Sequence, residues 1–368
     1  MATTTPPATA RSRFSRITWI DSFLWMIRIL AIVIISWGII GTIIDAANGI
    51  GPSAANWRDL VVAGLAQGAM YGLIALGYSM VYGVLGFINF AHGEVFMSGA
   101  MVGFFVADKL FEAGLWVDNF ILAFLIVLIA SIATSTLVAV IVEKVAYRPL
   151  RAAPRLIPLI TSIGISFFLQ YAFFGLFGPA VKNYPQLPTW LTQKRDIFGV
   201  LQIEGTKIVV LVVAVVAMTA LYQFVERTKT GRAMRAVAED KEIAALMGIN
   251  VDRIVVTTFA VGGAMAGVAG ILWAMLFRGV SFITGFLPGI KAFTAAVLGG
   301  IGNMAGAMTG GVVLGLFEGV GPQLVLGGLG IPGVSQLKDV VAFTALVLVL
   351  IFRPSGLLGE RLGSEDRA

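Results

Sequence analysis

The sequence predicts an all-α protein that crosses a membrane many times. Hydrophobic residues make up 58% of its 368 residues, charged residues make up only 12%, and the mean hydropathy is +0.92. Its apolar residues gather in runs close to the roughly 20 residues that a helix needs to span a bilayer. Within lipid the backbone polar groups must be satisfied inside each segment, so these runs should be helical. We therefore predict one polytopic helical bundle with about eight to ten transmembrane helices.

Charge and cysteine content exclude several other classes of protein. The net charge of +6 does not indicate a nucleic-acid partner, because the basic residues lie in short loops beside apolar runs. Such loops are typical of the cytoplasmic side of a membrane protein. The absence of cysteine excludes disulfides, thiol catalysts and thiolate metal sites. A single histidine with one nearby carboxylate cannot complete a metal shell, so we expect no metal.

The N-terminal region predicts an uncleaved first helix. Residues 1–16 are rich in Pro, Thr and Ala and then basic, and an apolar run that carries Arg28 follows from Phe23 to Ile44. This run exceeds the apolar core of a signal peptide, which is about 7 to 15 residues long. We expect its basic end to lie inside the cell, with cleavage after Ala46 or Ala47 as the alternative.

Further apolar runs bring the total to about nine candidate crossings. Basic clusters in residues 143–155 and 226–253 predict that both of these loops are cytoplasmic. The segment from Pro179 to Lys207 then lies outside, where we expect a hairpin or a lid that could receive a binding protein. The alternative is a self-packed cap over the helix ends. The runs are Leu60–Phe87, Val95–Ala107, Phe120–Val142, Leu156–Gly178, Ile208–Phe224, Ile254–Phe277, Lys291–Val320 and Val340–Phe352.

Two glycine-rich points are predicted to interrupt the helices. One lies inside the run Lys291–Val320, and the other lies within the stretch from Leu60 to Ala107. In the run Lys291–Val320, Gly299, Gly300 and Asn303 stand together, and each glycine costs a helix roughly 1 kcal/mol relative to alanine. A break there would return the C-terminal tail to the cytoplasmic side. The earlier break is the segment GFINFAHGE, Gly86–Glu94. Gly-interrupted segments in both halves of a transporter typically mark its substrate path.

Polar residues at these breaks are the candidate path or gate. Ionisable groups inside a membrane cost roughly 2.5 to 3.5 kcal/mol at mid-bilayer and so tend to mark function. The alternative is a structural role, in which the histidine is hydrogen-bonded and the glutamate satisfies backbone donors. The predicted path residues are Asn89, His92, Glu94, Gly299, Gly300 and Asn303.

Other glycines recur at four-residue spacing, which predicts close helix–helix contact. They include Gly64, Gly68 and Gly72 in one run and Gly311, Gly315 and Gly319 in another.

The segment Glu226–Arg253 is an island of charge between two apolar runs. It holds eleven of the chain's 46 charged residues, and we expect one helix from Ala233 to Met247 that ends at Gly248. We interpret it as a docking element for another protein. The alternative is an amphipathic interfacial helix held to lipid by Arg232 and Arg235.

Three blocks in order resemble the branched-chain amino-acid permeases of the ABC transporter superfamily. They are YGLIALGYSMVYGVLGFINFAHGE at Tyr71–Glu94, GRAMRAVAEDKEIAALMGI at Gly231–Ile249, and KAFTAAVLGGIGNMAGAMTGG at Lys291–Gly311. The resemblance covers residues 56–368 and leaves residues 1–55 as an N-terminal extension with one membrane helix. It implies a second homologous permease subunit, two cytoplasmic ATPase subunits and a periplasmic or extracellular solute-binding protein. It also implies a multi-pass protein of a prokaryotic inner membrane.

The resemblance also assigns the charged island to the cytoplasmic coupling loop, residues 226–253. EIAALMG, Glu242–Gly248, is similar to the E-A-A-x-x-x-G loop that seats on the ATPase, with Ile243 in place of the first alanine. ATP would be used by that partner, because this chain has no Walker arrangement of glycines followed by Lys and Ser or Thr. The implied docking residues are Gly231, Arg232, Arg235, Glu239, Glu242, Ala244, Ala245 and Gly248.

The expected function is therefore passage and coupling rather than bond chemistry. The chain would form half of the path of an ATP-driven importer of leucine, isoleucine and valine, with urea or short amides as alternative substrates. The rival class is an ion-coupled secondary transporter of amino acids, in which Glu94 and His92 relay protons or cations. An enzyme is not expected, because the sequence offers no convincing paired carboxylate, metal or nucleophile constellation.

Overall fold

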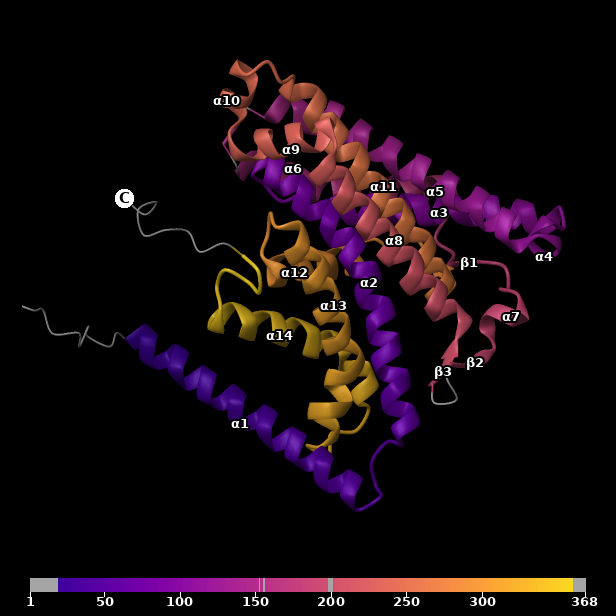
Figure 1. Cartoon of the computed structure of the whole chain (residues 1–368), viewed down its shortest axis with the longest axis vertical. Coiled ribbons are helices and arrows are strands. Elements are labelled where there is room, and N and C mark those ends of the chain that lie inside the picture. The colour runs from indigo at the N-terminus through magenta and orange to yellow at the C-terminus, as the bar shows by residue number, and fades with distance from the viewer. Residues whose placement is uncertain (1–18, 152, 155, 198–200, 360–368) are drawn as a thin grey trace, which may run out of the picture.

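Long apolar helices form nearly all of the structure in Figure 1, a computed structural model that describes residues 19–151, 153–154, 156–197 and 201–359. Several parts of the sequence predictions fall outside the described residues. They are the basic N-terminal segment, Arg155, residues 198–200 of the expected external segment and residues 360–368 of the tail. The helices are α1 (Trp19–Ala47), α2 (Ala54–Leu85), α3 (His92–Glu112), α4 (Leu115–Asp118), α5 (Phe120–Val142), α6 (Leu156–Phe177), α7 (Thr189–Thr192), α8 (Gly205–Arg227), α9 (Lys229–Glu239), α10 (Lys241–Leu246), α11 (Val251–Phe277), α12 (Phe286–Gly299), α13 (Met304–Gly321) and α14 (Lys338–Phe352).

Short elements connect these helices. The π-helical turn η1 (Glu143–Tyr147) and the 3₁₀ turn η2 (Arg148–Leu150) follow α5, while η3 (Pro322–Gly327) and η4 (Val334–Leu337) lie between α13 and α14. The strands are β1 (Lys182–Asn183), β2 (Lys194–Ile197), β3 (Leu201–Glu204) and β4 (Gly279–Val280).

The spans confirm the predicted helical membrane bundle. Within the described residues, eight helices are long and apolar enough to cross a membrane, and α12 is a shorter apolar helix. Each predicted run corresponds to a helix, except that Lys291–Val320 divides into α12 and α13 as expected. The break at Gly86–Glu94 is confirmed as well, because α2 ends at Leu85 and α3 begins at His92.

Glycines bring α2 and α13 into close antiparallel contact at the centre of the bundle. Gly64 lies against Gly315, and Gly68 lies against Gly311. The two helices therefore run in opposite directions. A Cβ on Gly315 would collide with the backbones of Gly64 and Gly68. Dispersion contacts and small residues, rather than a hydrophobic driving force, hold helices together in lipid. The predicted role of the regularly spaced glycines is thus confirmed for this pair.

This contact predicts opposite outcomes for two Gly→Ala substitutions. Gly315→Ala should destabilise the protein by about 1–3 kcal/mol, since overpacking forces the backbones apart. Gly164→Ala on α6 is the matched control, because nothing lies within 4 Å of a Cβ at that position. Alanine there should be neutral or raise stability by up to ~1 kcal/mol through helix propensity. Thermal unfolding of the two purified variants would contradict close packing if both melted alike.

The N-terminal helix α1 packs against the C-terminal part of the chain. Gly38 and Gly41 approach the backbones of Val325 and Gly328, and the Arg28 Nη2 atom donates to the Ile351 carbonyl at 2.6 Å. Figure 1 shows α1 at the edge of the bundle, beside α14. The described part of the predicted extension is therefore a helix attached to the outside of the bundle.

A cap of short elements covers the end of the bundle opposite α9 and α10 (Figure 1). Strand β1 pairs with β4, and β2 pairs with β3 in the predicted hairpin. Lys194 of β2 donates to Asp59 of α2 at 2.8 Å, and this hydrogen bond raises the pKa of Lys194. The hairpin is therefore tied to the start of α2.

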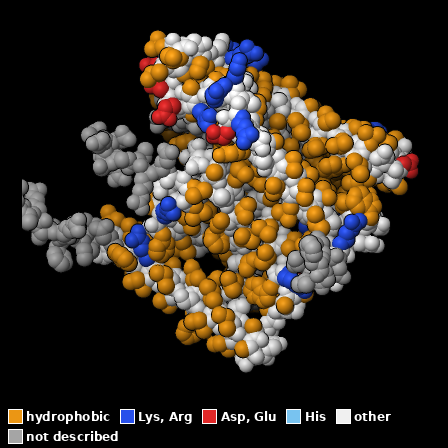
Figure 2. All heavy atoms as spheres, viewed as in Figure 1, with side chains coloured by type: hydrophobic (Ala, Val, Ile, Leu, Met, Phe, Trp, Pro, Cys, Tyr) orange, Lys and Arg blue, Asp and Glu red, His pale blue; other side chains and the backbone are white. Residues whose placement is uncertain are grey.

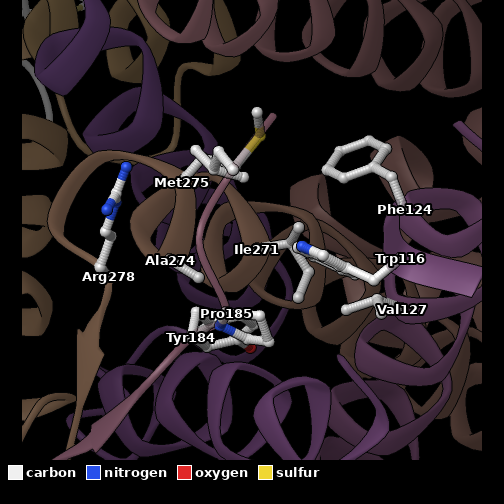
Figure 3. Close-up of a pocket in the computed structure, with 10 residues that line it drawn as sticks. Trp116, Phe124, Val127, Tyr184, Pro185, Ile271, Ala274, Met275 and Arg278 are labelled. Carbon is white, nitrogen blue, oxygen red and sulfur yellow. The ribbon is translucent and has the colours of Figure 1, made fainter. Parts of the chain in front are cut away.

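The segment before the hairpin is fixed to the bundle by two aromatic side chains. The Tyr184 hydroxyl donates to the Ala100 carbonyl at 2.5 Å, and Trp116 Nε1 donates to the Gln186 carbonyl at 3.0 Å. Figure 3 shows the narrow apolar pocket beneath this segment, with side chains of α5 on one side and of α11 on the other. The cap is thus packed on the helix ends by its own side chains.

Candidate functional site

The break between α2 and α3 gathers the polar residues that were predicted to line a path. Gly86 ends α2 with a φ of 78°, a left-handed conformation that glycine adopts without strain, and its N–H donates to the Tyr82 carbonyl at 2.7 Å. Asn89, His92 and Glu94 are each at most 2% exposed. The structure places these three residues against different neighbours.

His92 packs against α2. Its ring lies against Gly77, where a Cβ would collide with it, and it meets Tyr78 edge-on at a centroid distance of 4.9 Å. The His92 Nε2 atom has no hydrogen-bond partner within the described residues. Gly77 is therefore required by the close approach of this ring.

Glu94 lies where three elements meet. Its Oε1 atom accepts from Gln170 Nε2 at 2.8 Å and from Ser166 Oγ at 3.4 Å, both on α6. Its Oε2 atom faces Gly285, just before α12, and has no hydrogen-bond partner in the part of the chain that the structure describes. Glu94 stands in the first turn of α3, where the partial positive charge of the helix N-terminus offsets part of the cost of burying a carboxylate.

Asn89 contacts the other side of the break. The Tyr147 hydroxyl donates to Asn89 Oδ1 at 2.6 Å, and the Tyr147 ring meets Phe87 at 5.3 Å and Phe259 at 5.7 Å. Asn89 is thus bonded to the turn that follows α5, whereas Glu94 is bonded to α6.

The break between α12 and α13 is bound by the chain's own tail. Gly300 has a φ of 110°, and Asn303 Oδ1 accepts from the Gly306 N–H at 3.0 Å to cap α13. Asn303 Nδ2 donates to the Leu358 carbonyl at 3.0 Å, and the Leu358 N–H donates to Gly299 at 2.9 Å. The opposite end of α12, rather than this break, meets α3, since Gly289 lies against Gly93. Gly299, Gly300 and Asn303 therefore form a tail-bound site apart from Glu94.

A charged cluster that was not predicted joins α2, α12, α13 and α14. Lys291 Nζ donates to Glu318 Oε1 at 2.8 Å and lies 2.6 Å from Asp339 Oδ1, while the Tyr71 hydroxyl lies 3.5 Å from Glu318. Lys291 is 7% exposed and Glu318 is 3% exposed. Both residues interrupt otherwise apolar sequence, and that signal was available without the structure. Their pairing across elements was not.

The predicted coupling loop is helical but divided. The expectation of one helix from Ala233 to Met247 is wrong, because Asp240 separates α9 from α10. Asp240 Oδ1 accepts from the Glu242 and Ile243 N–H groups at 2.8 and 2.9 Å, which makes it the N-cap of α10. The predicted end at Gly248 is confirmed by its φ of 83°.

Docking residues of the loop divide between two faces. Gly231 and Ala244 are buried within the chain and face its interior, and their role in docking stays a prediction. The outward residues are Arg232, Arg235, Glu239, Glu242 and Ala245, with Arg235 paired to Glu226.

An exposed apolar group on α10 was also missed by sequence reasoning. Ile243, Leu246 and Met247 are 59%, 86% and 78% exposed. Figure 2 shows hydrophobic, basic and acidic side chains together at this end of the molecule, whereas the body is mainly hydrophobic. We call Ile243, Leu246 and Met247 the α10 apolar face.

Comparison with known proteins decides the family. A model described as the permease component of the branched-chain amino acid transport system matches residues 60–350. The chain belongs to this permease family. It is 44% identical over 314 residues to the high-affinity branched-chain amino acid transport system permease protein BraD of Pseudomonas aeruginosa, covering 84% of this chain and 98% of that protein. It is 41% identical over 299 residues to the corresponding LivH of Escherichia coli, covering 81% and 94%.

Family membership confirms the resemblance found in the sequence. The matched residues include the α2–α3 break, the coupling loop and the α12–α13 break of the permease. They begin after α1, so α1 lies outside the family match. The permease is an integral membrane transport protein.

Proposed function

We propose that this permease is the transmembrane subunit of an ATP-driven importer of branched-chain amino acids in a bacterial inner membrane. The observation that carries the proposal is 44% identity along 98% of a permease named for that transport. The chain would form half of the path with a second related permease subunit. Two ATPase subunits would use the ATP, and a solute-binding protein would deliver the amino acid on the opposite side.

The α10 apolar face supports a protein partner at the coupling loop. Its three side chains project from a polar loop rather than from an apolar run, and exposed apolar groups rimmed by charge are typical of protein interfaces. Glu242 and Arg232 lie outward nearby and supply charge for orientation. We assign this surface to the ATPase subunit.

The Glu94 site supports a path beside α3, α6 and α12. A buried carboxylate, one oxygen of which has no partner among the residues that the structure describes, is complementary to the ammonium group that every amino acid carries. Ser166 and Gln170 hold the other oxygen in place. We propose that movement of α12 away from Gly93 opens this site to the amino acid during alternating access.

Substrate class is tested by uptake into proteoliposomes that contain the whole complex. Labelled leucine, isoleucine and valine should enter and compete with one another, whereas excess urea should leave leucine uptake unchanged. Urea uptake with no leucine uptake would overturn the assignment to branched-chain amino acids.

Glu94→Gln should impair transport without impairing assembly. The substitution keeps the size of the side chain and removes its charge, and hydrogen bonds to charged groups contribute about 1.5–3 kcal/mol. Leucine uptake at subsaturating concentration should fall about 10- to 100-fold. Co-purification of the ATPase should remain at the wild-type level.

Glu112→Gln at the other end of α3 is the control for this prediction. Glu112 pairs with Lys109, and both side chains are exposed, so the loss of this charge should leave uptake near the wild-type value. Normal uptake by Glu94→Gln would show that this carboxylate has a structural role only.

A further inference from the structure

The π-helical turn η1 lies between the coupling loop and the α2–α3 break. It continues α5 for five residues before the chain turns toward α6. π-helical turns are rare and are often found at functional sites. Both ends of η1 carry fully buried side chains with polar contacts, Glu143 and Tyr147, at 0% exposure.

One end of η1 is joined to the start of α11, at the C-terminal end of the coupling loop. Arg151 forms two ion pairs at once. Its Nη2 atom donates to Glu143, and its Nη1 atom donates to Asp252. Asp252 stands in the first turn of α11, just after the left-handed Gly248 that ends the coupling helices. Arg148 also bonds Asp252, at 2.8 Å, but contacts it at an exposed position. Arg151 is therefore a bridge between α11 and a buried carboxylate of η1.

The other end of η1 is joined to the break. Tyr147 stands four residues after Glu143 and donates its hydroxyl to Asn89 at 2.6 Å. Its ring is packed between Phe87 and Phe259, so the hydroxyl has little freedom to find another acceptor. A shift of η1 therefore moves or breaks the contact with Asn89.

A second contact connects the same two regions. Lys241, the first residue of α10, donates from Nζ to the Leu85 carbonyl at 3.3 Å, and Leu85 is the last residue of α2 before the break. The coupling loop thus contacts the residue just before the break directly, and it is connected to the break itself through η1.

We propose that η1 transmits movement of the coupling loop to the α2–α3 break, with Arg151, Glu143 and Tyr147 as positioning residues for transport. The inference rests on the proposed function, because it requires an ATPase that moves the loop. When α11 shifts relative to α5, Arg151 either carries Glu143 with it or loses one of its two carboxylates. The buried Glu143 charge makes the second state costly, so η1 follows α11.

Two arginine variants distinguish the loss of the Arg151–Glu143 contact from the loss of a positive charge beside Asp252. Arg148→Ala and Arg151→Ala each remove one cation from Asp252, but only Arg151→Ala disconnects Glu143. The readout is ATP hydrolysed per leucine imported by the whole complex in proteoliposomes. Arg151→Ala should raise this ratio about tenfold, within the usual range of coupling between sites, and Arg148→Ala should leave it near wild type. Arg151→Lys should rescue little, because one ammonium replaces the two-pronged guanidinium.

Removal of the Tyr147 hydroxyl tests the other end of η1 and leaves no large cavity in the packing. Tyr147→Phe keeps the ring between its aromatic neighbours and removes the bond to Asn89, so it should raise the same ratio. Tyr184→Phe is the matched control, since it also removes a buried hydroxyl bond, to the Ala100 carbonyl, in the distant cap. The double variant Arg151→Ala with Tyr147→Phe should be no worse than the more affected single variant, as expected for residues on one connection.

The outcomes distinguish this inference from the proposed function. Wild-type ratios in both Arg151→Ala and Tyr147→Phe, in a complex whose uptake requires ATP, would overturn the role of η1 alone. Wild-type uptake that does not require ATP would overturn the proposed function itself. If Arg151→Ala fails to assemble, Tyr147→Phe decides, and a wild-type ratio in that variant overturns the inference.

Discussion

Lys291→Met should cost the permease about 3–5 kcal/mol of stability, the usual cost of removing one partner from a buried ion pair. Methionine fills the space of the lysine stem but leaves Glu318 buried at 3% exposure and leaves Asp339 without its cation. Glu318 Oε2 already lacks a hydrogen-bond partner within the described residues, and the Tyr71 hydroxyl lies 3.5 Å from Oε1, too far to replace the lysine charge. Thermal unfolding of the purified variant should therefore occur well below the wild-type temperature.

Two comparisons make the Lys291 prediction specific. Lys194→Met breaks an ion pair with Asp59 in which the side chains are 49% and 40% exposed, and should cost no more than about 1 kcal/mol. The double variant Lys291→Met with Glu318→Met should recover much of the loss, because no uncompensated glutamate remains. Equal melting of Lys291→Met and wild type would show that the cluster contributes nothing to the fold.

Leu246→Asp should separate the permease from its ATPase while leaving the permease folded. Leu246 is 86% exposed and projects from α10, so the change removes no contact inside this chain. An apolar anchor at the centre of an interface typically contributes 2 kcal/mol or more, so binding should weaken about 30-fold. The measurement is the amount of ATPase that co-purifies with the tagged permease, alongside the melting temperature of the permease.

Val181→Asp provides the control for Leu246→Asp. Val181 is 59% exposed and directly precedes β1, which lies away from α10 in Figure 1, so the substitution introduces the same charge far from the α10 apolar face. ATPase recovery should stay at the wild-type level in that variant. Undiminished recovery with Leu246→Asp would mean that the α10 apolar face is not the docking surface.

Local chemistry made the two breaks and the end of the coupling loop predictable. Gly86, Gly248 and Gly300 adopt positive φ angles that other residues rarely adopt. Asn303 caps α13. Each of these residues determines where a helix ends or begins through contacts with residues close to it in the sequence. Asp240 is a further local signal: its side chain accepts from the Glu242 and Ile243 N–H groups and starts a new helix, so the single helix expected there was wrong. Signals of this kind can be found in a sequence.

Contacts between distant segments could not be predicted in the same way. Lys291 and Glu318 lie 27 residues apart, and Tyr147 and Asn89 lie 58 apart, so their pairing depends on how the helices pack. The same holds for Ala244, whose burial depends on which face of α10 meets α11 and α9. Sequence pattern gives the residue type at each position but leaves open which side chains meet.

We expect this permease to couple ATP hydrolysis to amino-acid uptake. The decisive experiment measures leucine uptake and ATP hydrolysis in the same proteoliposomes, prepared with the permease, its related subunit, the ATPase and the binding protein. Uptake should require ATP, should stop when the ATPase is omitted, and should be unaffected when proton and sodium gradients are collapsed. Uptake driven by an ion gradient with no ATPase present would contradict this account and favour an ion-coupled secondary transporter.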